Sequence, residues 1–180
     1  MDSTATLVFV AGIENSGPTH WQAIWHDRVP NGVWVEHESW DNPVRDLWVK
    51  DLDDALRAID GPKIIVAHSL GCTVVAEWAS EHQDDTVVGA FLAALPDVHG
   101  DNFPTQALGF GSPRLAPLPF RTVVLASEDD PYGSLESATA GAGHLGARLV
   151  NVGPKGHINA DSGLGDWPEG WAVLDDEFTG

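Results

Sequence analysis

Six short segments of the chain are either apolar or alternate between apolar and polar residues, and turn residues separate them. Runs such as 64–67 and 87–94 are apolar or small throughout, which is typical of strands buried on both faces of a parallel sheet. Residues 33–38 alternate instead and indicate a half-exposed edge strand. The predicted strands are 6–11, 33–38, 64–67, 87–94, 122–127 and 148–152.

Segments with a helical spacing of apolar residues lie between most of these strands. Thr19 is a suitable cap for the first helix, and Asn42 with Pro43 suits the first turn of the second. The predicted helices are 19–28, 42–59, 73–79, 134–145 and a C-terminal segment that follows 167–170 and ends near 178. This alternation predicts an α/β fold with a doubly wound, mostly parallel six-stranded sheet and helices on both faces.

One long segment, 95–119, shows neither the helical nor the strand spacing of apolar residues, and it is rich in glycine and proline. An irregular stretch of this length inside a compact domain is often functional. We therefore expect it to line or cover a substrate site. The chain contains no repeat and no linker, and its 180 residues suit one domain, 1–180.

The composition narrows the class of protein. A formal net charge of −18 argues against nucleic acid or an anionic membrane as a partner, because both require basic patches. The charge fits either a high-salt environment or a plain compositional bias. No apolar run approaches the roughly 20 residues of a membrane helix, and residues 1–4 do not begin a signal peptide. The single cysteine, Cys72, agrees with a reducing compartment, so we expect a cytoplasmic protein.

The most informative stretch is 63–72, where a predicted strand ends and a helix begins around Ser69. Small residues stand two positions before and after this serine, at Ala67 and Gly71, and match the pattern of a nucleophile elbow. The turn is tight, so a large side chain there would collide with the adjacent strand or helix. Ala67 replaces the usual first glycine. The alternative is that Ser69 only caps the helix, since serine is a favoured N-cap.

Reactive side chains follow three of the predicted strands, at the sheet edge where α/β proteins bind ligands. Ser69 follows the third strand, Asp129 and Asp130 follow the fifth, and His157 follows the sixth. This is the chain order of an α/β-hydrolase triad, in which the histidine takes the serine proton and the carboxylate orients the histidine. We predict Asp130 as the acid, because Pro131 stiffens its turn. Asp129 remains the alternative, since neighbouring turn residues point different ways.

Acyl transfer also requires an oxyanion hole. One donor is expected to be the backbone N–H of Leu70, and the other that of Ile13 in the loop after the first strand. Gly12 precedes this second donor. His20 and Trp21 follow in the same region and are candidates for substrate contact, although Trp21 equally suits a place in the core.

The chain resembles the small serine hydrolases that include the retinoblastoma-binding hydrolase of animals and the bacterial YdeN-like proteins. The resemblance spans nearly the whole chain. It is carried by 12–21 (with Ser16-Gly17-Pro18-x-His20-Trp21), 67–71, 127–132, 156–160 and 165–168. It implies a minimal α/β-hydrolase with little or no lid, and a triad of Ser69, Asp130 and His157. The animal protein is named for a Leu-x-Cys-x-Glu binding motif, but Val74 replaces the glutamate here, so that partner is not implied.

The expected function is hydrolysis of a small-molecule ester, thioester or amide through an acyl-enzyme, as in carboxylesterases. No cofactor is expected. No metal is expected either, because His157 and Asp161 lack a recognisable ligand spacing. A non-catalytic binding or regulatory protein on a hydrolase scaffold is the alternative, and a serine peptidase is another, since fold does not fix function. The acyl group, the leaving group and the oligomeric state stay open.

Overall fold

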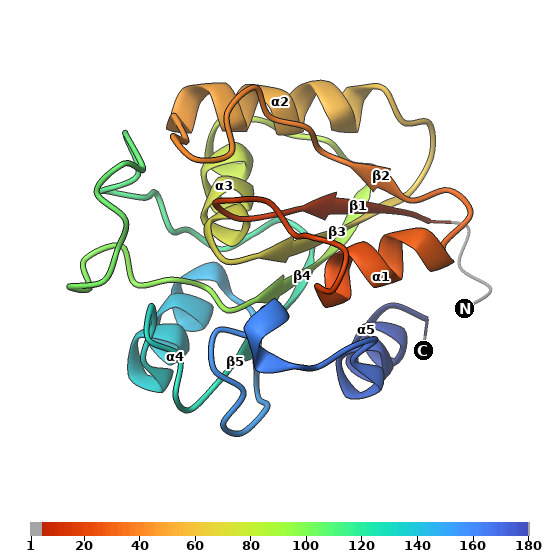
Figure 1. The fold of residues 1–180 in the computed structure, drawn as a ribbon. Helices are drawn as coiled ribbons and strands as arrows, with labels where there is room; N and C mark the ends of the chain where they lie inside the picture. The colour runs from red at the N-terminus through yellow and green to blue at the C-terminus, as the bar shows by residue number, and fades with distance from the viewer. Residues whose placement is uncertain (1–4, 180) are drawn as a thin grey trace.

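A computed structural model describes residues 5–179, and it consists of one sheet with helices on both sides (Figure 1). The strand order is β2-β1-β3-β4-β5-β6, and every neighbouring pair is parallel. This confirms the predicted α/β fold. Residues 1–4, where a signal peptide was considered, lie outside the described residues. The strands are β1 (Thr6–Val10), β2 (Val33–Trp34), β3 (Lys63–His68), β4 (Val87–Ala93), β5 (Arg121–Ala126) and β6 (Arg148–Asn151).

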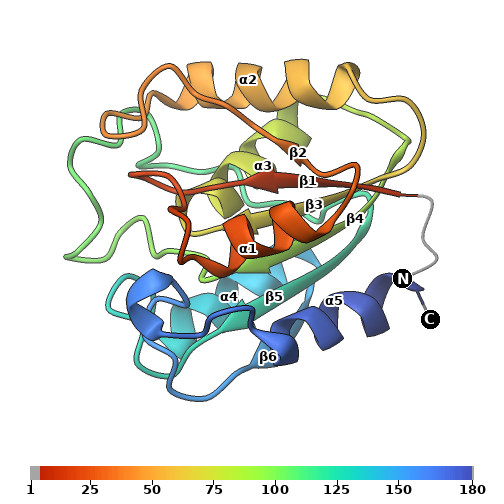
Figure 2. The same cartoon turned by 45° about the vertical axis from the view of Figure 1, so that its right-hand side comes forward.

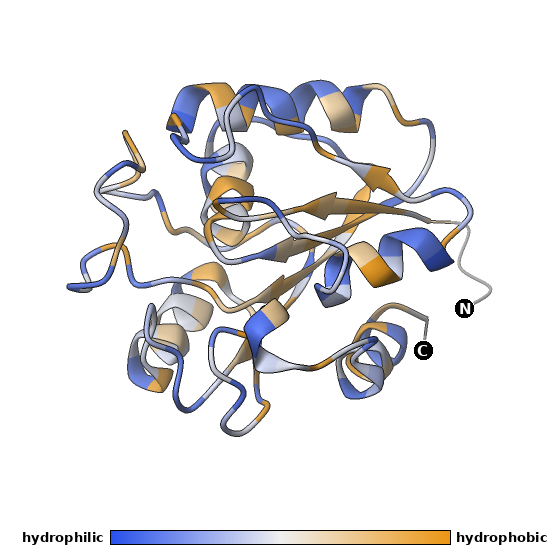
Figure 3. Ribbon diagram, viewed as in Figure 1, coloured by the Kyte–Doolittle hydropathy of each residue, from blue (hydrophilic) through white to orange (hydrophobic). Residues whose placement is uncertain are grey.

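The helices form two layers because successive side chains of a strand point to opposite faces of the sheet. In β3, Ile65 and Ala67 belong to one apolar cluster, and Ile64 and Val66 belong to the other. The first cluster packs against α2 (Arg45–Arg57), α3 (Leu70–Glu81) and α4 (Leu135–Leu145), and the second against α1 (Trp21–Arg28) and α5 (Pro168–Thr179). The two helix layers can be followed in Figure 2, which shows the fold turned by 45°. The sheet between them is the most hydrophobic layer, as Figure 3 shows.

Several element boundaries differ from the predictions: helix α3, for example, extends over Leu70–Glu81 and not 73–79. Three other differences have a clear physical cause, and the start of α1 is the first. This helix begins at Trp21 with His20 as its N-cap, because the His20 ring accepts the Gln22 N–H at 3.1 Å. Thr19 lies in the preceding turn. The prediction that Thr19 caps the helix was therefore wrong: threonine is a favoured cap, but one ring nitrogen of a neutral histidine can also accept a backbone N–H.

The other two differences concern the edge of the sheet and α2. The edge strand β2 is only Val33–Trp34, shorter than the predicted 33–38. Helix α2 begins at Arg45 and not at Asn42, because the chain before it is paired elsewhere. Val44 forms a β-bridge with Leu108, and the N–H of Arg45 donates to the Leu108 carbonyl oxygen at 2.9 Å. A long-range contact thus overrides the local helix start.

The long segment 95–119 is irregular, as predicted, and a hydrogen bond to a buried carboxylate holds it against the helices. Glu77 of α3 is only 2% exposed, and its two oxygens accept hydrogen bonds from the backbone of Arg114 at 2.8 Å and from Nε of Arg45 at 2.9 Å. These bonds join α2, α3 and the segment. Within residues 5–179 no further domain stands over the strand ends, which agrees with a minimal hydrolase without a lid.

Candidate active site

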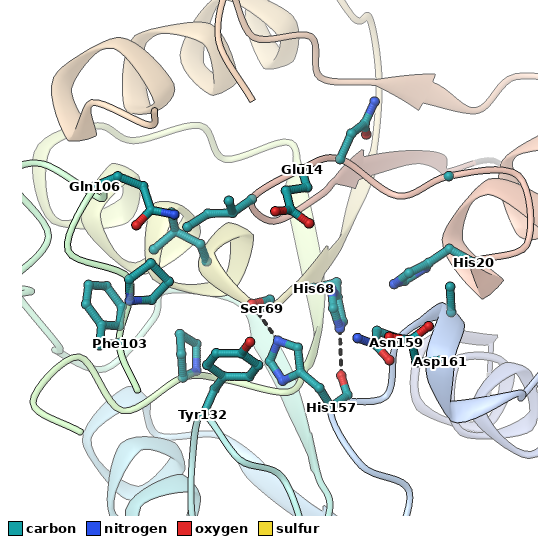
Figure 4. Close-up of a pocket in the computed structure, with 17 residues that line it drawn as sticks. Glu14, His20, His68, Ser69, Phe103, Gln106, Tyr132, His157, Asn159 and Asp161 are labelled. Carbon is teal, nitrogen blue, oxygen red and sulfur yellow. Dashed lines mark hydrogen bonds between the residues drawn. The ribbon is translucent and has the colours of Figure 1, made fainter. Parts of the chain in front are cut away.

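The carboxyl ends of β3, β5 and β6 bring Ser69, Asp130 and His157 into direct contact. Oγ of Ser69 lies 2.8 Å from Nε2 of His157 (Figure 4). Nδ1 of His157 lies 2.8 and 2.9 Å from the two carboxylate oxygens of Asp130. The side chains of Asp130 and His157 are only 3% and 10% exposed. The three residues therefore form one continuous hydrogen-bonded line with its acidic end shielded from water.

The chemistry of the acceptors fixes where the proton of His157 resides. An ionised carboxylate can only accept, so Nδ1 carries the proton and donates it to Asp130. The lone pair of Nε2 is then free to accept the hydroxyl proton of Ser69. The N–H of Tyr132 donates to Oδ1 of Asp130 at 2.9 Å and fixes the carboxylate. The histidine is thus held in the tautomer that a general base for Ser69 requires.

Ser69 occupies a strained turn between β3 and α3. Its φ of 53° and ψ of −127° lie outside the regions that residues with a Cβ normally adopt. Its side chain makes no hydrogen bond to the start of α3, which argues against the alternative of a simple helix cap. A Cβ on Gly71 would lie 2.4 Å from the Val10 carbonyl oxygen, so only glycine lets the helix approach β1 this closely. The structure therefore bears out the steric reason for the small residue at Gly71.

Asp129, the alternative acid, is hydrogen-bonded to partners other than the His157 ring. Its Oδ1 accepts hydrogen bonds from the Ser127 hydroxyl at 2.8 Å and from the Gly156 N–H at 2.7 Å. These two bonds lower the pKa of Asp129, and the bond from the Ser127 hydroxyl has the larger effect. The Ser127 hydroxyl in turn accepts the N–H of Lys155 at 2.8 Å. Asp129 therefore holds the turn that carries His157, while Asp130 contacts the imidazole.

Two further histidines lie beside His157, and sequence reasoning assigned no role to one of them, His68. The ring of His68 donates from Nε2 to the backbone carbonyl oxygen of His157 at 2.9 Å, and its centroid is 4.6 Å from that of His20. Burial lowers the pKa of His68, and the neighbouring His20 and His157 lower it further. Burial and then His157 lower the pKa of His20 to about 4. The signal that was available is a histidine directly before Ser69, at the end of a wholly buried strand.

A cavity of about 390 Å³ opens above Ser69 and reaches the loop after β1 (Figure 4). Ile13 and Leu70, the expected oxyanion donors, both line it, and a Cβ on Gly12 would lie 2.9 Å from that of Ser69. This close approach brings the Ile13 loop onto the nucleophile. The segment 95–119 supplies part of the wall, as expected, through Pro96, Phe103, Pro104 and Gln106.

The structure separates the two residues named as candidate substrate contacts. His20 lines the cavity and lies among its labelled side chains in Figure 4. Trp21 does not line it: its side chain is 1% exposed, and its Nε1 donates to the Ile158 carbonyl oxygen at 2.8 Å. Trp21 therefore takes the core position that its sequence allowed. Its hydrogen bond supports the segment directly after His157.

The described part of the chain contains neither a cluster of metal-ligating side chains nor a helix that could span a membrane. No group of three or more histidine, cysteine, aspartate or glutamate side chains within it is arranged to hold a metal ion. None of its helices combines the length and the apolar character needed to cross a membrane.

Solved structures similar to this chain include several proteins described as hydrolases. A protein described as a YdeN-like hydrolase from Pectobacterium atrosepticum is 29% identical and superposes with a TM-score of 0.84, over 96% of this chain and 90% of its own. The ydeN gene product of B. subtilis is 19% identical, with a TM-score of 0.83 over 98% of this chain and all of its own (100%). Est1E of Butyrivibrio proteoclasticus, solved with ferulic acid bound, shares the fold at 10% identity and a TM-score of 0.74, over 100% of this chain and 92% of its own.

The family of this chain follows from a comparison of its sequence with family models. No curated protein sequence matches the chain. The model of the serine hydrolase family, however, matches residues 7–176, a span that contains every strand but the first residue of β1, and also Ser69, Asp130 and His157. The chain therefore belongs to the serine hydrolase family.

Proposed function

We propose that this protein hydrolyses a small ester, thioester or amide through an acyl-enzyme formed on Ser69, as carboxylesterases do. The observation that carries the proposal is the line of contacts from Oγ of Ser69 through the His157 ring to Asp130. A serine hydroxyl is a weak nucleophile until a base takes its proton. The contacts supply that base in the correct tautomer, together with the carboxylate that stabilises its cation.

The proposed reaction has two halves. In the first, Oγ of Ser69 attacks the substrate carbonyl carbon while Nε2 of His157 takes the hydroxyl proton. His157 then gives this proton to the leaving group as its bond to the carbonyl carbon breaks. In the second half, His157 takes a proton from water, the hydroxide adds to the acyl carbon, and Ser69 recovers its proton as the acid leaves. No step of this sequence requires a cofactor.

Backbone donors and the cavity supply the rest of the proposed site. The N–H groups of Leu70 and Ile13 stabilise the negative oxygen that develops on the substrate carbonyl. Leu70 begins α3, so its N–H also lies at the positive end of a helix dipole. A cavity of about 390 Å³ is of the size that holds small ligands. His20 contacts the substrate from the cavity wall.

Turnover of short p-nitrophenyl esters tests this proposal. Wild-type protein should release p-nitrophenol, and Ser69→Ala should lower kcat/KM by several orders of magnitude, because the nucleophile and its base act as one unit. Ser80→Ala, at the other end of α3, is the matched control, because the Ser80 hydroxyl bonds only within its own helix. A Ser69→Ala protein as active as wild type would refute the proposal. A folded wild-type protein that hydrolyses no ester would favour the binding-protein alternative.

A further inference from the structure

A second cavity, of about 530 Å³, is lined by α4 and by residues 95–99 and 112–115 of the long irregular segment, which Figure 1 locates. Thr73 of α3 also lines it. Its volume lies in the range of small-molecule sites. Among the described residues, only Pro96 lines both this cavity and the one above Ser69. The two cavities are therefore neighbours but distinct.

The wall of the second cavity is mainly apolar and contains no lysine or arginine. Its apolar side chains are those of Leu95, Pro96, Val98, Pro113, Leu115 and Ala140. Asp97 is its one carboxylate within the described chain, and its Oδ1 already accepts the N–H of His99 at 2.9 Å. An anion would meet a like charge here and no guanidinium or ammonium group. The cavity therefore favours an uncharged ligand with an apolar body.

A buried hydroxyl in this wall has no hydrogen-bond partner. Thr73 is only 1% exposed, and its Oγ1 makes no hydrogen bond with any described residue. A threonine inside a helix can avoid this by donating to the carbonyl oxygen one turn earlier, which here would be that of Ser69. The unpaired hydroxyl costs stability, and an oxygen atom of a bound ligand would satisfy it. The second cavity thus offers a polar anchor as well as apolar surface.

The chemistry of this hydroxyl narrows the class of ligand. Thr73 can donate or accept a hydrogen bond, because a hydroxyl has one proton and two lone pairs. An alcohol can pair with it in either direction, whereas a ketone or an ether can only accept. An alcohol also has no charge to bring into the apolar wall.

We infer that the second cavity is a binding site for an uncharged aliphatic alcohol. The hydroxyl of the ligand pairs with Thr73, and its hydrocarbon chain packs against the apolar wall. This site goes beyond the proposed function and does not depend on it, because none of the residues that line the cavity belongs to the triad.

A ligand in this cavity would contact a part of the chain that supports the candidate active site. The N–H of Asp97 donates to the Tyr132 carbonyl oxygen at 2.8 Å. The N–H of Tyr132 in turn donates to Oδ1 of Asp130 at 2.9 Å. The wall of the second cavity is thus two hydrogen bonds away from the carboxylate that contacts His157.

Titration of 1-octanol into the wild-type protein, followed by ¹H–¹⁵N NMR, tests the inference. The amide signals of Val98, Ser137 and Gly141 should shift and saturate, because these residues line the second cavity. Shortening the probe to 1-hexanol should weaken binding about tenfold, since two fewer methylene groups are buried. No saturable shift, or saturable shifts only at Asn15 and Asn159 of the cavity above Ser69, would overturn the inference.

Two variants of Thr73 test the anchor. Thr73→Val replaces the hydroxyl with a methyl group of similar shape, so it should weaken 1-octanol binding about threefold or more. It should not lower the thermal midpoint, because it removes a buried hydroxyl that has no partner. Thr73→Ser keeps the hydroxyl and should bind 1-octanol more tightly than Thr73→Val. Equal affinities of wild type and Thr73→Val would overturn the assigned role of the hydroxyl.

A second pair of variants tests the location. Ala140 is exposed on α4 and lines the second cavity, so Ala140→Phe should fill part of the cavity and weaken 1-octanol binding at least about tenfold. Thr139→Phe is the control, because Thr139 is the adjacent exposed position and lines none of the described cavities. It should bind as wild type does. Unchanged binding by Ala140→Phe would place the alcohol elsewhere and overturn the inference.

Charged probes of the same chain length test the class of ligand. Octanoate and octylammonium should each bind at least about tenfold more weakly than 1-octanol, because each must bring a charge to an apolar wall. Octylammonium that binds as tightly as 1-octanol would make Asp97 the anchor in place of Thr73 and overturn the inference. None of these measurements requires ester hydrolysis, so a failure of the proposed function would leave the binding site standing.

Discussion

His68 donates its Nε2–H to the backbone carbonyl oxygen of His157 at 2.9 Å, and so joins the residue before Ser69 to the residue that activates it. The bond ties the end of β3 to the loop after β6. The first of these carries Ser69 and the second carries His157. Proton transfer requires Oγ of Ser69 to stay near Nε2 of His157, from which it lies 2.8 Å away. His68 is therefore a positioning residue for the proposed reaction, acting through the backbone of His157.

Replacing His68 should impair turnover more than folding. His68→Phe keeps a ring but removes the donor and leaves the His157 carbonyl unpaired, so kcat should fall about tenfold. His68→Gln retains an N–H donor and should recover part of that loss. The measurements are kcat, KM and the thermal midpoint of each variant. Equal kcat values for the phenylalanine and glutamine variants would contradict a role for the hydrogen bond.

Asp130 and Asp129 should respond differently to removal of their charge. Asp130→Asn no longer forces the His157 proton onto Nδ1, so kcat/KM should fall about a thousandfold or more. Asp129→Asn weakens the bonds to Ser127 and Gly156 and should cost much less activity, because the imidazole of His157 is hydrogen-bonded to Asp130 and not to Asp129. Ester hydrolysis at pH 7.5 measures both effects. A larger loss with Asp129→Asn would reverse the assignment.

Gly12 and Gly17 offer a matched test of the loop after β1. A Cβ on Gly12 would lie 2.9 Å from Cβ of Ser69 and 3.3 Å from its Oγ, so Gly12→Ala should displace the loop and lower kcat/KM at least about tenfold. A Cβ on Gly17 meets nothing within 4 Å, so Gly17→Ala should retain wild-type turnover. Similar activities for the two variants would show that the close approach is not required.

The pKa of His20 predicts how stability changes with pH. The folded protein holds this pKa at about 4, below the usual 6.5, so between these values the unfolded chain binds more protons. The free energy of unfolding should therefore fall as pH drops from 6.5 to 4, by up to about 3 kcal/mol. His20→Asn keeps an N-cap acceptor and removes the titration. Urea unfolding from pH 7 to pH 4 should show a flatter profile for this variant, and parallel profiles would contradict the account.

Much of the fold was predictable because local patterns determine it. The buried strands are apolar, and α4 begins after Ser134 and ends at Gly146 in the left-handed conformation that favours glycine. The start of α2 was not predictable, since the bridge between Val44 and Leu108 depends on a segment far along the chain. In that case tertiary pairing decides the boundary.

Part of the candidate site was likewise predictable from the sequence, and part was not. Ser69, Asp130 and His157 were predictable because the carboxyl ends of parallel strands meet at one edge and the chain order is informative. The contact of His68 with the His157 backbone was not, because sequence alone does not show which loops meet above the strands. The cavity lined by Thr73 was not predictable either, because it lies between α4 and the segment 95–119, whose irregular path no local pattern determines.

Labelling with a fluorophosphonate probe tests the central claim most directly, because this reagent reacts with serines that a neighbouring base has activated. Intact mass and peptide mapping of wild-type protein should give a single adduct on Ser69. The adduct should be absent from Ser69→Ala and reduced at least about a hundredfold in rate in His157→Ala. Folded wild-type protein without an adduct, or with an adduct that forms equally fast in His157→Ala, would contradict the account.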